Sequence, residues 1–133
     1  MPPDSTSLEG EIVDRFYAAL ARKDLASALA CCTENACFWH NFDDVEQNLE
    51  QAARGWQALF DGFTENRIDK VRRDPIPGGL VQRHRFLLRA ADGVLKARPC
   101  CIFVSFSAGR IARLDEYIDL SGALPVEAAD ECA

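Results

Sequence analysis

The segment Ala36-Cys37-Phe38-Trp39-His40-Asn41 is short, aromatic and apolar, and it interrupts a series of helical patterns. Residues of these types are typical of a β-strand. On its N-terminal side lie two stretches with helical spacing, and on its C-terminal side lies a third. A chain that places one strand between helices and then continues with strands is predicted to be an α+β protein.

Two amphipathic helices are predicted before this strand. Thr6 and Glu9 are spaced as a capping box, and apolar residues then repeat at helical spacing over residues 8–20. Asp24 is placed to cap a second helix that continues to Cys32. The two stretches therefore predict a helix hairpin.

A third helix is predicted directly after the strand. Asp43 with Glu46, and Asp44 with Gln47, offer overlapping capping boxes. Apolar residues from position 45 to position 60 then share one helical face. We therefore expect the helix to begin within residues 43–47.

The sequence changes after Gly62 to runs that are separated by turn signals. The turns fall at residues 75–79, 91–93 and 107–109, and the runs between them cover residues 64–74, 80–90, 94–106 and 110–119. Runs of about ten residues suit a twisted antiparallel meander. Pro99 falls inside the third run, which indicates a bulge or an edge position there.

Together these elements predict a cone-shaped α+β fold. Three N-terminal helices are expected to pack on a strongly curved, mainly antiparallel sheet that encloses a pocket. The 133 residues suffice for one domain with an interior cavity. We expect its core to span about residues 8–120 and residues 121–133 to form a loose tail.

Composition and charge argue against several classes of function. The chain is 48% hydrophobic and carries a formal net charge of −6, whereas proteins that bind nucleic acid generally have a basic face or stripe. It has neither an export signal nor an apolar run long enough to cross a membrane. We therefore expect a cytoplasmic protein that binds neither nucleic acid nor membrane.

We expect the six cysteines to be reduced thiols and not to form disulfides. Two pairs of them are sequence neighbours, and no export signal accompanies them. With only two histidines and no metal-ligand spacing, the sequence predicts no metal site. No phosphate-binding loop, dinucleotide fingerprint or nucleophile elbow is present, so we expect a pocket that works without a cofactor.

Four segments carry a resemblance to a known superfamily. They are residues 12–20, residues 23–25, the segment 35–41 around the first strand, and residues 109–119 with the sequence GRIARLDEYID. They resemble the nuclear transport factor 2-like superfamily, which includes ketosteroid isomerases, limonene epoxide hydrolases, scytalone dehydratase and SnoaL-like polyketide cyclases. The resemblance implies the cone fold, but it assigns no reaction because this superfamily keeps its scaffold and changes its pocket.

The ketosteroid isomerase pattern is only partly matched. The position of its catalytic base matches His40. Its tyrosine donor matches Phe16, with Tyr17 one residue out of phase, and its second donor matches Cys101, shortly after Pro99. Because both donors are replaced, the resemblance does not imply a steroid isomerase.

Two other patterns of the superfamily are also incomplete. Residues 39–41 resemble the tyrosine-x-asparagine pair that orients water in limonene epoxide hydrolases, and Glu116 matches their acid on the last strand. The middle-strand acid of those enzymes is lacking near residues 82–86, where His84 stands. The two histidines and the carboxylate of scytalone dehydratase are closer in residue type to His40, His84 and Glu116.

Alternation along the strands predicts where these candidates point. On the second run of the meander, His84 shares a face with Gln82, Phe86 and Leu88, while the arginines on the opposite face belong in water. His84 is therefore expected to face inward.

Glu116 shares a face with Leu114 and Ile118, which makes it an acid among apolar neighbours. Desolvation there would raise its pKa and suit it to proton transfer or to orienting an imidazole.

The sequence leaves alternatives open at each of these positions. A slip of one residue in the first strand would turn Trp39 and Asn41 inward in place of His40. His84 could equally be a core histidine that a backbone carbonyl satisfies. Glu116 could pair with an arginine on a neighbouring strand or lie at a dimer face.

We expect a hydrophobic small molecule as the ligand. The leading hypothesis is a cofactor-independent isomerase, dehydratase or cyclase that transfers protons on a carbonyl or hydroxyl compound. His40 would be its general base or acid, Glu116 the second acid/base, and His84 and Asn41 would position substrate or water. The expected substrate-binding residues are Phe16, Tyr17, Trp39, Asn41, Trp56, Phe60, Phe86, Cys101, Phe103, Leu114 and Ile118.

The alternative hypothesis is a non-catalytic ligand-binding or dimerisation module of the same fold. The resemblance also implies a homodimer that pairs through the outer face of the sheet.

Overall fold

The computed structural model describes residues 5–121 and 124–126, and its order of elements is that of an α+β protein. The elements are α1 (Ser5–Ala21), α2 (Leu25–Ala30), β1 (Cys32–His40), β2 (Glu46–Asn48), α3 (Leu49–Gly62), β3 (Glu65–Ile76), β4 (Gly79–Arg89), β5 (Leu95–Ser107), β6 (Arg110–Ile118) and β7 (Leu124–Pro125). The helix hairpin, the strand, the third helix and the four-stranded meander are all confirmed.

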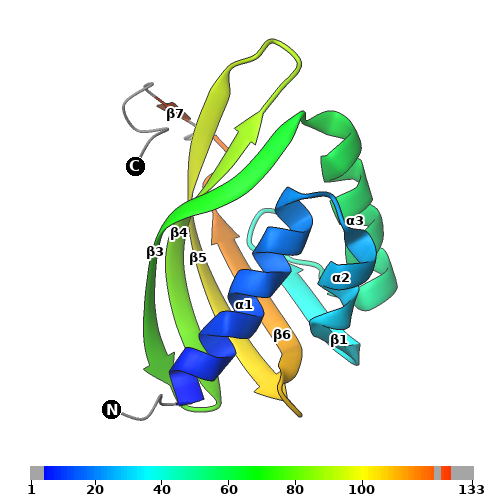
Figure 1. Ribbon diagram of the computed structural model, residues 1–133, viewed down its shortest axis with the longest axis vertical. Helices are drawn as coiled ribbons and strands as arrows, with labels where there is room; N and C mark the ends of the chain where they lie inside the picture. The colour runs from blue at the N-terminus through cyan, green and yellow to red at the C-terminus, as the bar shows by residue number, and fades with distance from the viewer. Residues whose placement is uncertain (1–4, 122–123, 127–133) are drawn as a thin grey trace.

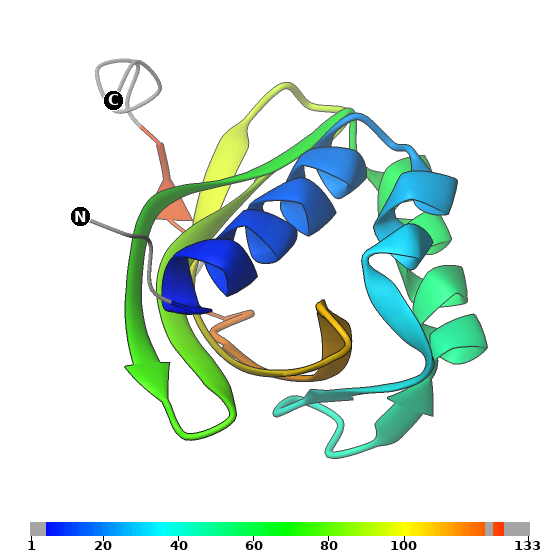
Figure 2. The same cartoon turned by 60° about the horizontal axis from the view of Figure 1, so that its bottom comes forward.

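One curved sheet runs through the molecule in the order β2-β1-β6-β5-β4-β3, with β7 paired to β5. Neighbouring strands are antiparallel except β1 and β6, which are parallel. Figure 1 shows the three helices on one side of this sheet, and Figure 2 shows the sheet curling around α1. The concave face of the sheet therefore becomes the interior, and the expected cone fold is confirmed.

The helix hairpin forms as predicted, but α2 ends at Ala30, and Cys32, which was expected in the helix, begins β1. The sheet-facing residues of α1 recur at intervals of three and four and are at most 5% exposed: Val13, Phe16, Tyr17 and Leu20. Asp24 then caps α2, because its carboxylate accepts the backbone N–H of Ser27. The cap predicted at Asp24 is confirmed.

The third helix begins later than predicted. Asn48 is its N-cap, in a reciprocal capping box with Gln51. Asp44 has a positive φ of 53°, which a helix does not allow, and its carboxylate accepts the Trp39 indole N–H instead. Asp43 accepts the backbone N–H of Val45, and this local turn uses the carboxylate that the predicted cap required.

Pro99 lies at a local edge within β5. The pairing of β5 with β4 continues past this residue, opposite Arg85. On the other side, β6 pairs only as far as Cys100, and β7 pairs only at Lys96 and Ala97. Pro99 has no backbone N–H, and it lies between the residues of β5 that pair with β6 and those that pair with β7, where no donor to a neighbouring strand is needed. The bulge in the β5–β6 pairing lies elsewhere, between Ser105 and Phe106.

Part of the predicted loose tail is ordered. Leu124–Pro125 pair with β5, and the backbone N–H of Val126 donates to the carbonyl of Leu95. Val126 packs beside Leu87, Leu95 and Ala97, and this small cluster explains why the chain returns to the sheet here. The remainder of the predicted tail, residues 122–123 and 127–133, lies outside the described residues.

Candidate active site

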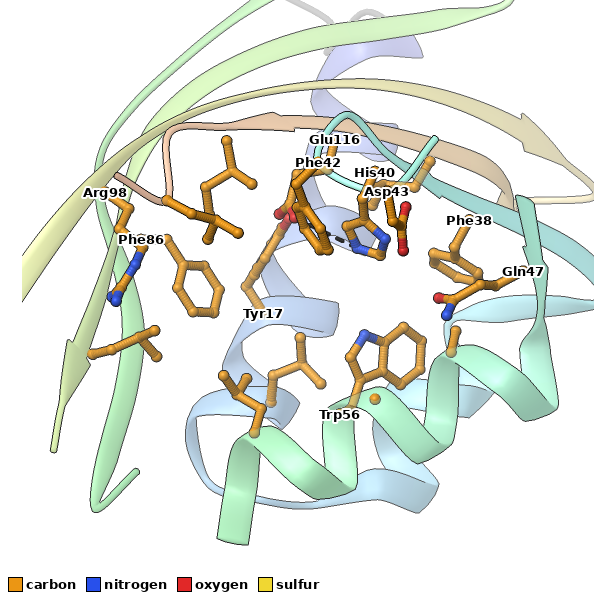
Figure 3. A pocket seen from close by; sticks show the side chains of 18 of the residues that line it. Tyr17, Phe38, His40, Phe42, Asp43, Gln47, Trp56, Phe86, Arg98 and Glu116 are labelled. Carbon is orange, nitrogen blue, oxygen red and sulfur yellow. Dashed lines mark ion pairs between the residues drawn. The ribbon is translucent and has the colours of Figure 1, made fainter. Parts of the chain in front are cut away.

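A cavity of about 360 Å³ lies between the concave face of the sheet and helices α1 and α3. Its walls are mainly apolar, and they include Phe16, Tyr17, Leu20, Phe38, Trp56, Leu59, Phe86, Leu88, Leu114 and Ile118. Its polar lining side chains are His40, Asp43, Gln47, Arg98 and Glu116 (Figure 3). An apolar cavity with a few polar groups is the usual form of a small-molecule site.

His40 and Glu116 meet in the wall of this cavity. They occupy opposite positions in the parallel pair β1–β6, and His40 Nε2 lies 3.5 Å from Glu116 Oε1. The backbone N–H of Asn41 donates to the Glu116 carbonyl, which holds the two strands in this register. Of the two registers that the sequence left open for β1, the structure has the one with His40 inward.

Glu116 lies in an environment that favours its protonated form. Burial raises the pKa of this carboxyl above its usual value, and the nearby His40 only partly opposes the effect. The Cys100 thiol donates to Glu116 Oε2 over 3.5 Å and also opposes it weakly. A carboxyl of this kind can take up or release a proton closer to neutral pH than an exposed one.

Tyr17 supplies a phenol beside this pair. Burial, and next the charge of Glu116, raise the pKa of Tyr17 well above its usual value. Figure 3 shows the Tyr17 side chain extending from α1 toward Glu116. The phenol therefore stays protonated at neutral pH and is available as a hydrogen-bond donor.

The His40 ring stacks on a neighbouring aromatic ring, and one of its two nitrogens has no hydrogen-bond partner among the described residues. Phe42 stacks on it, with ring centroids 5.0 Å apart and an interplanar angle of 29°. Its Nδ1 atom is buried and has no hydrogen-bond partner among the described residues. The imidazole is thus fixed in orientation, while Nδ1 has no hydrogen-bond partner in the part of the chain that the structure describes.

Three aromatic rings form one wall near His40. Trp56 meets Phe16 and Phe38 edge to face, at centroid distances of 5.2 and 5.1 Å. Phe86 and Tyr17 form a further edge contact at 6.5 Å. Phe60, which we expected to bind substrate, is 5% exposed in the core and does not line the cavity.

His84 faces inward as alternation predicts, but it lies behind Tyr17 and does not line the cavity. Its Nδ1 atom is 3.0 Å from Gln82 Nε2, while Gln82 Oε1 accepts from Arg73. Because the Gln82 amide must therefore donate to His84, the imidazole is neutral with its proton on Nε2. Burial, and next the charge of Arg73, lower the pKa of His84 to about 4.

Four residues predicted to bind substrate lie on the outer side of the sheet instead: Trp39, Asn41, Cys101 and Phe103. Strand alternation is the reason, because each neighbours an inward residue in sequence. Cys100, not Cys101, is the inward thiol of β5, and Asn41 uses its side-chain oxygen to accept the backbone N–H of Ile118.

Trp39, Phe103 and Tyr117 form an aromatic cluster on this outer face. Tyr117 contacts Trp39 at a centroid distance of 5.1 Å and Phe103 at 6.0 Å. Phe103 and Tyr117 are 41% and 48% exposed. We call these three residues the outer cluster.

Several cavity residues were not identified from the sequence. Arg98 continues the inward alternation of Cys100, Ile102 and Val104, and this signal could have identified it. Phe42, Asp43 and Gln47 come from the segment between β1 and α3, and the sequence assigned Asp43 and Gln47 to the start of the third helix.

The part of the chain that the structure describes contains no group of three or more His, Cys, Asp or Glu side chains that could hold a metal ion. Within the same part, no helix is both long and apolar enough to span a membrane.

Residues 13–114 match the SnoaL-like domain family. The chain belongs to this family. No curated protein is significantly similar to it in sequence. The matched range includes β1 and most of the sheet, so His40 lies inside it, while Glu116 lies two residues beyond its end.

Solved structures show the same fold at low sequence identity. A provisionally assigned polyketide cyclase from Xanthomonas campestris pv. campestris is 17% identical, with a TM-score of 0.75 over 88% of this chain and 94% of its own. AusH from Aspergillus nidulans is 15% identical, with a TM-score of 0.76 over 90% and 88%. An LEH-like epoxide hydrolase from M. tuberculosis is 15% identical, with a TM-score of 0.72 over 88% and 86%. Similarity at this level identifies the fold of the SnoaL-like protein and not its reaction.

Proposed function

We propose that this SnoaL-like protein is a cofactor-independent acid–base enzyme that acts on a hydrophobic carbonyl or hydroxyl compound. The observation that carries the proposal is the pair His40 and Glu116 in the wall of an apolar cavity, 3.5 Å apart. A desolvated carboxyl beside an imidazole is an arrangement suited to proton transfer. Structural neighbours described as a cyclase and as an epoxide hydrolase also use this fold.

His40 is the proposed proton acceptor. An imidazole can accept a proton at a ring nitrogen, and Glu116 lies where a carboxylate would stabilise the imidazolium that forms. On a ketone, the C–H proton moves to the imidazole and the electron pair of that bond moves onto the carbonyl oxygen. Return of the proton to another carbon completes an isomerisation, and its transfer to a leaving hydroxyl completes a dehydration.

Tyr17 is the proposed donor to the substrate oxygen. Its phenol remains protonated because burial and Glu116 raise its pKa. A hydrogen bond to an oxygen that gains negative charge stabilises the enolate more than the ketone, which lowers the barrier. Tyr17 thus occupies the role that the sequence comparison left without a residue at Phe16.

Hydrogen exchange on a simple ketone tests this proposal without the natural substrate. We expect the protein to accelerate deuterium incorporation from D2O at the α-carbons of 2-tetralone, measured by NMR. Removal of a general base typically costs roughly 10²–10⁴-fold, so His40→Gln and Glu116→Gln should reduce exchange toward the buffer rate.

The matched control is Tyr117→Phe, which alters β6 beside Glu116 but on the outer face. This variant should exchange 2-tetralone at the wild-type rate. Wild-type exchange in both His40→Gln and Glu116→Gln would contradict the assigned roles. Binding of 2-tetralone without any accelerated exchange would instead favour the non-catalytic binding module.

A further inference from the structure

Arg98 is the one half-buried arginine of the described residues for which no acidic partner is found. The other arginines of intermediate exposure each pair with a carboxylate: Arg67 and Arg89 with Glu65, Arg73 with Asp14, Arg85 with Asp69, and Arg113 with Glu46 and Asp115. In Arg98, Nε and Nη1 are buried and hydrogen-bond to no described residue. Buried N–H groups of a guanidinium are costly when no acceptor pairs with them, so the site favours an oxygen acceptor.

The side chain of Arg98 belongs to the cavity. Arg98 lies opposite Phe86 in the β4–β5 pair and lines the cavity with it. Figure 3 shows the guanidinium beside Phe86, whereas His40 and Gln47 lie toward the other end, with Tyr17 in between. A ligand that contacts both ends therefore presents one group to Arg98 and a different group to His40.

The charges in the cavity favour an anion at the Arg98 end. Arg98 is the only permanently cationic side chain among the described lining residues. Glu116 is already engaged by His40 and Cys100, and Asp43 accepts the backbone N–H of Val45. An anionic group would be repelled by the ionised form of either acid, whereas at Arg98 it would be attracted.

We propose that Arg98 binds a carboxylate of the substrate, so that the ligand is a hydrophobic carboxylic acid with its reacting carbon held near His40. A single guanidinium matches the geometry and the charge of one carboxylate. A phosphate, with more charge and more acceptor oxygens, would require further donors that the apolar walls do not provide. The inference rests on the proposed function, because it specifies the substrate class of the same cavity.

A pair of matched probes tests the inference. 2-Naphthoate and 2-naphthamide share an aromatic body and differ mainly in charge. By calorimetry near neutral pH, we expect the wild type to bind 2-naphthoate about tenfold more tightly than 2-naphthamide, because a charged hydrogen bond exceeds a neutral one by roughly that factor.

Arg98→Met should remove the preference. We expect affinity for 2-naphthoate to fall by about tenfold or more while affinity for 2-naphthamide stays within about twofold. Arg98→Lys keeps the charge without the planar fork and should retain part of the preference. The control Arg83→Met removes the same charge from an exposed position on β4, and its preference should match that of the wild type.

Equal affinities for the two probes in the wild type would overturn the inference and leave the proposed function standing. A preference for 2-naphthoate that persists in Arg98→Met would do the same. If neither probe binds the folded wild type, both the carboxylate site and the proposed small-molecule function are contradicted.

Discussion

His84 should make the protein less stable in acid, and the size of the effect can be worked out from its surroundings. The imidazole is 4% exposed, and its Nδ1 faces the Gln82 amide that donates to it. Protonation would place a second donor against that amide and bury a charge near Arg73. These conditions lower the pKa of His84 from 6.5 to about 4.

The direction of the pH effect on stability follows from the number of protons that the folded and unfolded chains bind. Between about pH 4 and pH 6.5 the unfolded chain binds a proton at this site and the folded chain does not. Stability therefore falls as the pH is lowered through this window. With these two pKa values, the loss between about pH 7.5 and pH 5 is about 2 kcal/mol.

Urea unfolding of the wild type and His84→Gln at both pH values measures this contribution. The wild type and the variant have the same acidic groups, so the difference between their pH dependences gives the contribution of His84 to stability. We expect the variant to lose about 2 kcal/mol less than the wild type on acidification. Equal losses would refute the reasoning, as would an NMR titration that places the pKa of His84 in the folded wild type near 6.5.

Two further predictions concern Glu116 and the outer cluster. Because burial raises the pKa of Glu116, the folded chain retains this proton above the usual pKa of 4.5, and stability declines as the pH rises through that region. Glu116→Gln should therefore be more stable than the wild type near pH 8 and should lose this advantage near pH 4 in urea unfolding; the opposite trend would contradict it. We also propose that two copies pair through the outer cluster, since Phe103 and Tyr117 are 41% and 48% exposed there. Light scattering at micromolar concentration should give a dimer for the wild type and a monomer for Phe103→Glu, whereas a monomeric wild type would exclude this interface.

The sequence predicts the fold well because its signals are local. The cap at Asp24, the turns of the meander and the apolar repeat of α1 depend on residues close together in sequence, and the helix hairpin and the meander form in the expected order. The start of α3 was misplaced because two candidate caps, Asp43 and Asp44, precede the actual cap, Asn48. The structure shows that the Asp44 carboxylate instead accepts the indole N–H of Trp39, a contact that the sequence pattern does not reveal.

The site is less predictable because it depends on which face a residue occupies. Phe38 lies inside and Trp39 outside, so the aromatic character of β1 does not reveal its register. Cys100 and Cys101 are adjacent and identical, and residue type alone cannot show which one faces Glu116. Arginines are usually exposed, so the sequence does not distinguish Arg98 from the solvent-facing charged residues of the sheet.

The parallel pairing of β1 with β6 has a consequence for redesign. His40 and Glu116 are joined by the hydrogen-bond ladder of the sheet, and the carbonyl of Glu116 and the backbone N–H of Ile118 both bind Asn41. Trp56 and Leu59, in contrast, reach the cavity from α3. New substrate shapes could therefore be accommodated by exchanging residues of the helix while the reacting pair keeps its spacing.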